Sequence, residues 1–181
     1  MVAHDQAAEG VTNLHVEMKS ALVDGFDRAA PDLIKPNAEE LAGVIGYSPQ
    51  ALEAAVAQGD PEPVVAAAQR LVDRGVGAVL ATLGAAGAVL VTDAGSWLAI
   101  PPPTVPRSTV GAGDSSLAGY VLADIGGADP PHRLQMAVGY GSAAAALPGS
   151  ALPTPSEIDL NAVRVTPISS VPPARTSSAS S

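Results

Sequence analysis

The octapeptide Ser108-Thr109-Val110-Gly111-Ala112-Gly113-Asp114-Ser115 carries the strongest signal in this chain, because a glycine-rich turn leads directly into an apolar helical pattern. Free amides at the start of a helix point outward and bear about half a unit of positive charge, so this turn predicts an anion pocket. Gly111 and Gly113 permit positive φ and let a ligand approach the backbone closely. Asp114 places a carboxylate next to that pocket. An anion pocket beside a general base is the arrangement that phosphoryl transfer to a hydroxyl requires.

A second polar segment runs from Asp32 to Glu40 and follows a short apolar strand at Leu33-Ile34. Pro36 prevents a helix from starting before Asn37, which is a favoured N-cap residue. Asn37 and Glu40 lie three residues apart on the first helical turn, so both side chains can face one ligand. The same spacing fits an ordinary capping box equally well. The segment therefore predicts a helix start, and its ligand role stays open at this point.

A third segment, residues 78–90, is typical of a strand, a glycine turn and a second strand. Its turn is Thr82-Leu83-Gly84-Ala85-Ala86-Gly87. Taken alone, this pattern indicates a β-hairpin whose two glycines serve the turn geometry.

In this order, the three segments closely resemble the signatures of the PfkB (ribokinase-like) carbohydrate kinases, over residues 32 to 152. Ser108 before the threonine resembles the phosphofructokinase branch of that family. The resemblance implies that Asp114 is the base that takes the proton from the sugar hydroxyl. It implies that the amides of Gly111, Ala112 and Gly113 form the anion hole for the transferring phosphoryl group.

The same resemblance implies ATP and Mg²⁺ as cofactors and a phosphosugar as substrate. Glu40 would contact the metal ion, through water, and small residues within 134–152 would make room for the adenine ring. The residues expected to bind the nucleotide are Asn37, Thr82, Leu83, Gly84, Ala85, Ala86, Gly87 and Gly113.

The fold implied by the resemblance is the three-layer α/β/α ribokinase-like fold, in truncated form. The N-terminal strands and the β lid of such kinases find no counterpart in this sequence. We assign residues 21–164 to the C-terminal part of the kinase domain, leave 1–20 unassigned, and expect a disordered Pro/Ser-rich tail over 165–181.

Two functions remain open for a chain of this kind. The first is phosphoryl transfer to fructose 1-phosphate or a related phosphosugar. The second is a non-catalytic nucleotide-binding fragment, or a half-enzyme that needs a partner chain. A homodimer, or the missing N-terminal half in trans, would supply that partner.

Apolar patterning and Pro/Gly positions predict alternating helices and strands. Strands that alternate with helices favour a parallel-type sheet covered on both faces. The expected helices are 13–29, 37–45, 49–58, 61–74, 112–125 and 131–146, and the expected strands are 32–35, 77–82, 87–92 and 96–100.

Composition excludes several other classes of protein. The net charge of −9 disfavours binding to nucleic acid or to a membrane surface, and the lack of cysteine removes thiol catalysis and disulfides. No apolar run reaches the length of a membrane span, so we expect a cytoplasmic location. The sequence also lacks the P-loop pattern.

One rival enzyme class shares part of the octapeptide. Ser115 as nucleophile, with His132 as base and Asp129 as its orienting partner, imitates the sequence blocks of an esterase family. The two blocks lie too close together in the chain for that family, and its oxyanion element is absent. We therefore set this alternative aside.

Overall fold

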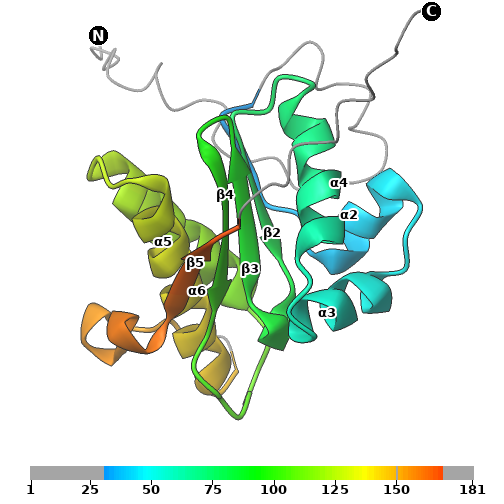
Figure 1. Cartoon of the computed structure of the whole chain (residues 1–181). Coiled ribbons are helices and arrows are strands. Elements are labelled where there is room, and N and C mark those ends of the chain that lie inside the picture. Colours follow the sequence, from blue (N-terminus) through cyan, green and yellow to red (C-terminus); the bar gives the residue numbers. More distant parts are fainter. Residues whose placement is uncertain (1–30, 150, 169–181) are drawn as a thin grey trace, which may run out of the picture.

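The computed structural model of the chain describes residues 31–149 and 151–168. The helix expected over 13–29 and the segment left unassigned at 1–20 lie outside the described residues. A five-stranded sheet forms the centre of the described part, with the strands in chain order from one edge to the other (Figure 1). Its strands are β1 (Leu33–Ile34), β2 (Ala78–Thr82), β3 (Ala88–Thr92), β4 (Gly95–Ile100) and β5 (Arg164–Pro167).

The direction of the strands differs from the sequence-based prediction. Only β1 and β2 run parallel, whereas β2 to β5 pair in antiparallel order. Short turns join β2 to β3 and β3 to β4, and a turn of that length can link only antiparallel neighbours. The helical crossover between β1 and β2 is long enough for parallel pairing. The expectation of a parallel-type sheet was therefore wrong beyond the first pair of strands.

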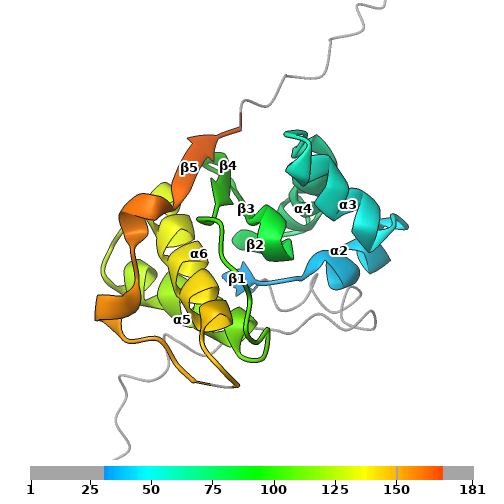
Figure 2. The same cartoon turned by 90° about the horizontal axis from the view of Figure 1, so that it is seen from below.

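Helices cover both faces of the sheet, as predicted (Figure 2). One face carries α2 (Ala38–Ile45), α3 (Pro49–Ala57) and α4 (Glu62–Val72), and the other carries α5 (Ala112–Ile125) and α6 (Pro130–Ala146). Short 3₁₀ turns lie at Gly84–Ala86, Pro155–Glu157 and Leu160–Ala162. Three layers are therefore present, in agreement with the α/β/α expectation. None of the helices in this part of the chain combines the length and the apolar character needed to cross a bilayer.

Alternating side chains of the central strands divide the core into two halves. On β2, Val79 and Ala81 pack with the helices α2 to α4, whereas Ala78 and Leu80 pack with α5 and α6. Successive residues of a strand point to opposite faces, so a strand covered on both faces must be apolar throughout. This explains why β2 and β3 are continuous apolar runs in the sequence.

Glycines let α5 and α6 approach closely. A Cβ on Gly119 of α5 would stand 2.6 Å from the carbonyl oxygen of Met136 on α6. A Cβ on Gly141 of α6 would stand 3.2 Å from the Cβ of Ser116 on α5. The packing of these two helices therefore sets where the start of α5 lies relative to α6.

The last strand contradicts the start of the disordered tail that we expected at residue 165. Arg164–Pro167 form β5, which pairs with the edge of β4, and the amide of Ile168 donates to the carbonyl of Ser96 at 2.8 Å. The disordered segment expected from residue 165 therefore does not begin there, because an open edge strand offers backbone partners that composition alone does not reveal. Residues 169–181 lie outside the described residues.

Candidate active site

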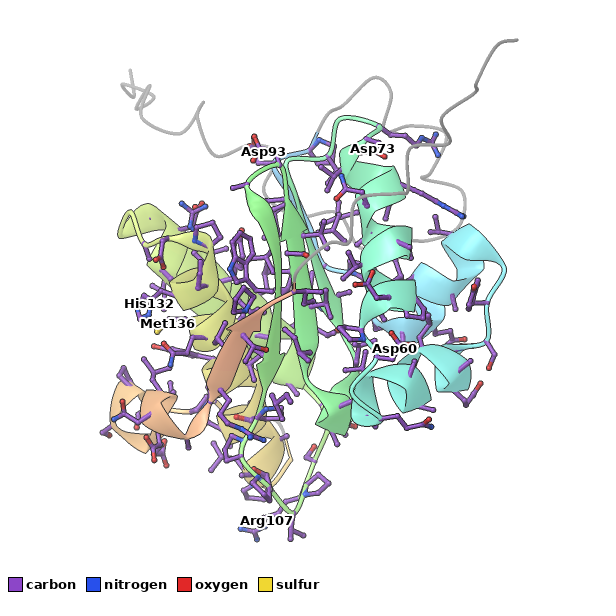
Figure 3. The ribbon with its side chains drawn as sticks, viewed as in Figure 1. Asp60, Asp73, Asp93, Arg107, His132 and Met136 are labelled. Atoms are coloured by element: carbon purple, nitrogen blue, oxygen red, sulfur yellow. The ribbon has the colours of Figure 1, made fainter. Side chains whose placement is uncertain are left out.

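A groove of about 1140 Å³ opens at one end of the sheet, and we call it the main groove. The start of α2, the first turns of α3, the turn between β2 and β3, the proline-rich loop after β4, the start of α5 and the C-terminal half of α6 line it. Figure 3 shows Arg107, in the loop that leads to α5, at the opposite end of the molecule from Asp93. The main groove thus draws together segments that lie far apart in the sequence.

Most of the residues expected to bind a ligand meet in the main groove. Those that line it are Asn37, Thr82, Gly84, Ala85, Gly87, Ala112 and Gly113. Leu83 and Ala86 instead pack their side chains into or against the hydrophobic core. Gly111, Asp114 and Glu40 lie next to lining residues without lining the groove themselves. Asp114 is exposed on the first turn of α5.

The start of α5 has the free amides that an anion site needs. Gly111 is the N-cap residue with φ of 79°, as its position in the octapeptide predicted. The amides of Gly113 and Asp114 donate to no backbone carbonyl among the described residues, whereas the amide of Ala112 donates to Thr109 at 3.3 Å. Two unsatisfied donors at a positive helix end favour an anion.

Gly113 has a different role from the one expected. It is helical rather than in the positive-φ region, so the predicted conformational requirement was wrong at this position. A Cβ on Gly113 would instead stand 3.2 Å from Nζ of Lys35. The missing side chain makes room for an ammonium group beside the free amides.

Lys35 is the functional candidate that sequence reasoning missed. In the sequence it is an isolated cation, but the structure places it at the end of β1, half-buried and lining the main groove. A usable signal existed, since a lysine directly after a buried strand leaves the sheet at its carboxyl end, where ligands of α/β proteins bind. Its ammonium group adds positive charge to the anion site.

Asn37 and Glu40 form a capping box. The amide of Glu40 donates to Oδ1 of Asn37 at 2.9 Å, and the amide of Asn37 donates to Oε2 of Glu40 at 2.8 Å. The amide of Thr82 donates to the carbonyl of Pro36 at 2.9 Å, which ties the end of β2 to the start of α2. The capping alternative is therefore confirmed, and a ligand role for either side chain stays a prediction.

Carboxylates are sparse at the main groove. Glu39 rather than Glu40 is the carboxylate of α2 that lines it. Glu53 of α3 also lines it. Nowhere among residues 31–149 and 151–168 do three or more His, Asp or Glu side chains gather as a metal site would require. Mg²⁺ is commonly held by one or two carboxylates together with substrate phosphates and water, so this small number of carboxylates is compatible with a phosphate-bound ion.

The esterase-like arrangement is absent. The Ser115 hydroxyl is buried and has no hydrogen-bond partner, so it is not joined to His132. The carboxylate of Asp129 caps α6 by accepting from the backbone amide of His132 at 3.0 Å. The ring of His132 contacts Gln135 at 3.2 Å. These residues are helix-start groups and form no nucleophile–base pair.

Comparison with known proteins places this geometry in a family. The profile described as pfkB family carbohydrate kinase matches residues 8–157, beginning within the segment that the sequence analysis left unassigned. A 1-phosphofructokinase of Rhodobacter capsulatus is 39% identical over 145 residues, which are 80% of this chain and 43% of that protein. The chain thus spans less than half the length of this relative.

Solved structures agree with that assignment. Phosphofructokinase-2 from Escherichia coli, in complex with substrates and products, matches with a TM-score of 0.62 and 30% identity, over 75% of this chain and 42% of that one. Ribokinase from Thermotoga maritima shares the fold with a TM-score of 0.56 at 22% identity, over 70% of this chain and 40% of that one. The matched signatures, the three-layer fold and the anion site at the start of α5 lead to one conclusion: the chain belongs to the pfkB family of carbohydrate kinases.

Proposed function

We propose that this chain carries the phosphoryl-transfer site of an ATP-dependent kinase that phosphorylates a sugar phosphate, with fructose 1-phosphate as the acceptor. The observation that carries the proposal is the anion site at the start of α5. There, the free amides of Gly113 and Asp114 and the ammonium group of Lys35 come together beside the main groove. Support for the acceptor comes from the relative named 1-phosphofructokinase.

The roles of the residues follow from their chemistry. The positive end of α5 and Lys35 hold the transferring phosphoryl group and balance the charge on its oxygens. Asp114 accepts the proton of the sugar hydroxyl as that oxygen forms its bond to phosphorus, while the bond from phosphorus to the departing ADP oxygen breaks. Asp114 is exposed on the first turn of α5, where an incoming hydroxyl can reach it.

The nucleotide would extend from this anion site along the main groove. Thr82, Gly84 and Gly87 line one wall through the turn between β2 and β3, and small residues of α6, among them Gly141, line another. Glu40 would hold Mg²⁺ through water, and the ion would neutralise phosphate charge when bound.

The substitution Asp114→Asn tests the assignment of the base. We expect the variant to bind Mg·ATP in a calorimetric titration as the unchanged chain does, and to lose phosphoryl transfer in a coupled ADP-release assay with fructose 1-phosphate. Asp93→Asn is the matched control, because Asp93 does not line the main groove and lies at the opposite end of the molecule from Arg107, which is in the loop that leads to α5 (Figure 3). Turnover that survives Asp114→Asn would overturn the role of Asp114.

A second candidate function is nucleotide binding without turnover by this chain alone, as a half-enzyme that needs a partner. Two observations favour it: the exposure of Asp114, and the coverage of only 43% of the 1-phosphofructokinase relative. Phosphoryl transfer benefits from a closed site that excludes water and orients the acceptor. Binding of Mg·ATP without ADP release would support this candidate, and turnover per milligram that rises with protein concentration would indicate a homodimer.

A further inference from the structure

Two adjacent serines of α5 lie in different surroundings. Ser115 and Ser116 are both buried, with 4% and 5% of their surface exposed. Ser116 lines the main groove, whereas Ser115 does not. A hydroxyl that opens onto a groove from an otherwise buried residue, and that has no partner in the protein, is placed to hydrogen-bond a ligand in that groove.

Within the part of the chain that the structure describes, no residue forms a hydrogen bond with Oγ of Ser116. Oγ of Ser115 is fully buried and also unpaired, whereas Oγ of Ser116 is not fully buried and lies at the main groove. Gly141 of α6 faces it, and a Cβ on that glycine would stand 3.7 Å from Oγ of Ser116. The bare backbone at Gly141 therefore leaves open the space beside the hydroxyl.

Ser116 also lies on the ligand side of α5. Residues three and four apart on a helix share a face, and Gly113 and Ala112 stand at those distances before Ser116. All three residues line the main groove, and Asp114 and Ser115 between them do not. A chain of phosphates whose end is held at Gly113 would pass Ser116 three residues further along the helix, a rise of about 4.5 Å.

We propose that the Ser116 hydroxyl donates a hydrogen bond to an inner phosphate of the bound nucleotide, one that ATP and ADP share. This inference rests on the proposed function, since it takes the terminal phosphoryl group to lie at the start of α5. The surroundings favour a donor role, because Ala137, Val138 and Gly141 of α6 offer no side-chain donor and the hydroxyl of Ser142 already donates to the carbonyl of Gly139 at 3.2 Å. A hydroxyl that donates to an ionised phosphate makes one of the stronger kinds of hydrogen bond.

The experiment compares Ser116→Ala with Ser115→Ala in the full chain, by calorimetric titration with Mg·ATP and with Mg·ADP. Each substitution removes the hydroxyl of one buried serine, at neighbouring positions of the same helix, so the two variants are matched in size and location. Thermal unfolding followed by circular dichroism establishes that both are folded. We expect Ser116→Ala to lower the affinity for both nucleotides roughly tenfold. We expect Ser115→Ala to leave both affinities unchanged.

The outcomes distinguish a failure of the proposed function from a failure of the role proposed for Ser116. If the unchanged chain binds neither nucleotide, the proposed function itself fails. If it binds them and Ser116→Ala binds equally well, the function stands and the role of Ser116 is overturned. If Ser116→Ala loses affinity for ATP but not for ADP, the hydroxyl lies at the terminal phosphate and the inner-phosphate contact is contradicted. An equal loss in Ser115→Ala would show an effect of packing instead.

Discussion

Nζ of Lys35 lies 3.2 Å from the point at which a Cβ on Gly113 would stand. Lys35 comes from the end of β1 and Gly113 from the first turn of α5, so the anion site is assembled from two distant segments of the chain. The glycine is needed there for space, because any side chain would press on the ammonium group.

Gly113→Ala is expected to weaken Mg·ATP binding several-fold without unfolding the protein. The added methyl group meets the flexible end of Lys35, which moves aside and takes its charge away from the free amides. Gly43→Ala in α2 is the matched control, since nothing lies within 4 Å of a Cβ at that position. Calorimetric titration of both variants checks this. Equal affinity in the two would show that the position of Lys35 is not important for binding.

Glu40 offers a way to separate capping from metal binding. Glu40→Ala breaks the capping box and is expected to lower the free energy of unfolding by about 1 kcal/mol, whereas Glu40→Gln retains a group that can accept from Asn37. If Glu40 also serves Mg²⁺, the glutamine variant is stable but needs more Mg²⁺ for the same ATP affinity. Urea denaturation and a Mg²⁺ titration measure the two effects. An unchanged Mg²⁺ requirement in Glu40→Gln would leave capping as its role.

Gly119→Ala is expected to destabilise the fold by about 1–3 kcal/mol, as overpacking does. A Cβ at this position would stand 2.6 Å from the backbone oxygen of Met136 and 2.9 Å from the ring of Tyr140, so α5 and α6 would have to move apart. Alanine has the higher helix propensity by about 1 kcal/mol, which works in the opposite direction. Chemical denaturation of Gly119→Ala and Gly43→Ala measures which effect is larger. The control Gly43→Ala has the gain in helix propensity without the clash. An equal increase in the free energy of unfolding of Gly119→Ala and Gly43→Ala would contradict the close approach of α5 and α6.

Tyr120 is expected to make the stability of the fold dependent on pH in the alkaline range. It lines a second cavity of about 410 Å³, together with Asp32, Asp93, Asp124 and Arg133. Burial raises the pKa of Tyr120 above 10.0, and the hydrogen bond and charge of Arg133 offset part of that rise. Arg133 in turn pairs with Asp124 at 2.6 Å.

The sign of this pH effect follows from the raised pKa. The unfolded chain releases the tyrosine proton near pH 10 and the folded chain only at higher pH, so this contribution to stability is complete below about pH 10 and is lost above it. Urea denaturation across pH 9 to 11.5 is expected to show a steeper loss for the unchanged chain than for Tyr120→Phe. Parallel curves for the two proteins would contradict the raised pKa.

Most helices and strands could be predicted because their signals are local. Pro49 and Asn37 mark helix starts, and the apolar runs around Leu80 and Leu90 mark strands that are buried on both faces. The direction of the strands could not be predicted from alternation alone. It depends on whether a link is a turn or a crossover, and the turns after β2 and β3 are too short for a crossover.

The candidate site also has some features that local sequence predicts and others that it does not. Local chemistry in the octapeptide determined the turn at Gly111, the helix that follows and the free amides at its start, because these depend on neighbouring residues. Tertiary packing decided that Lys35 joins those amides and that Ser116 rather than Ser115 lines the main groove. Contacts of this kind join segments that are distant in the chain. They are set by how helices pack on the sheet and on each other, which no local pattern encodes.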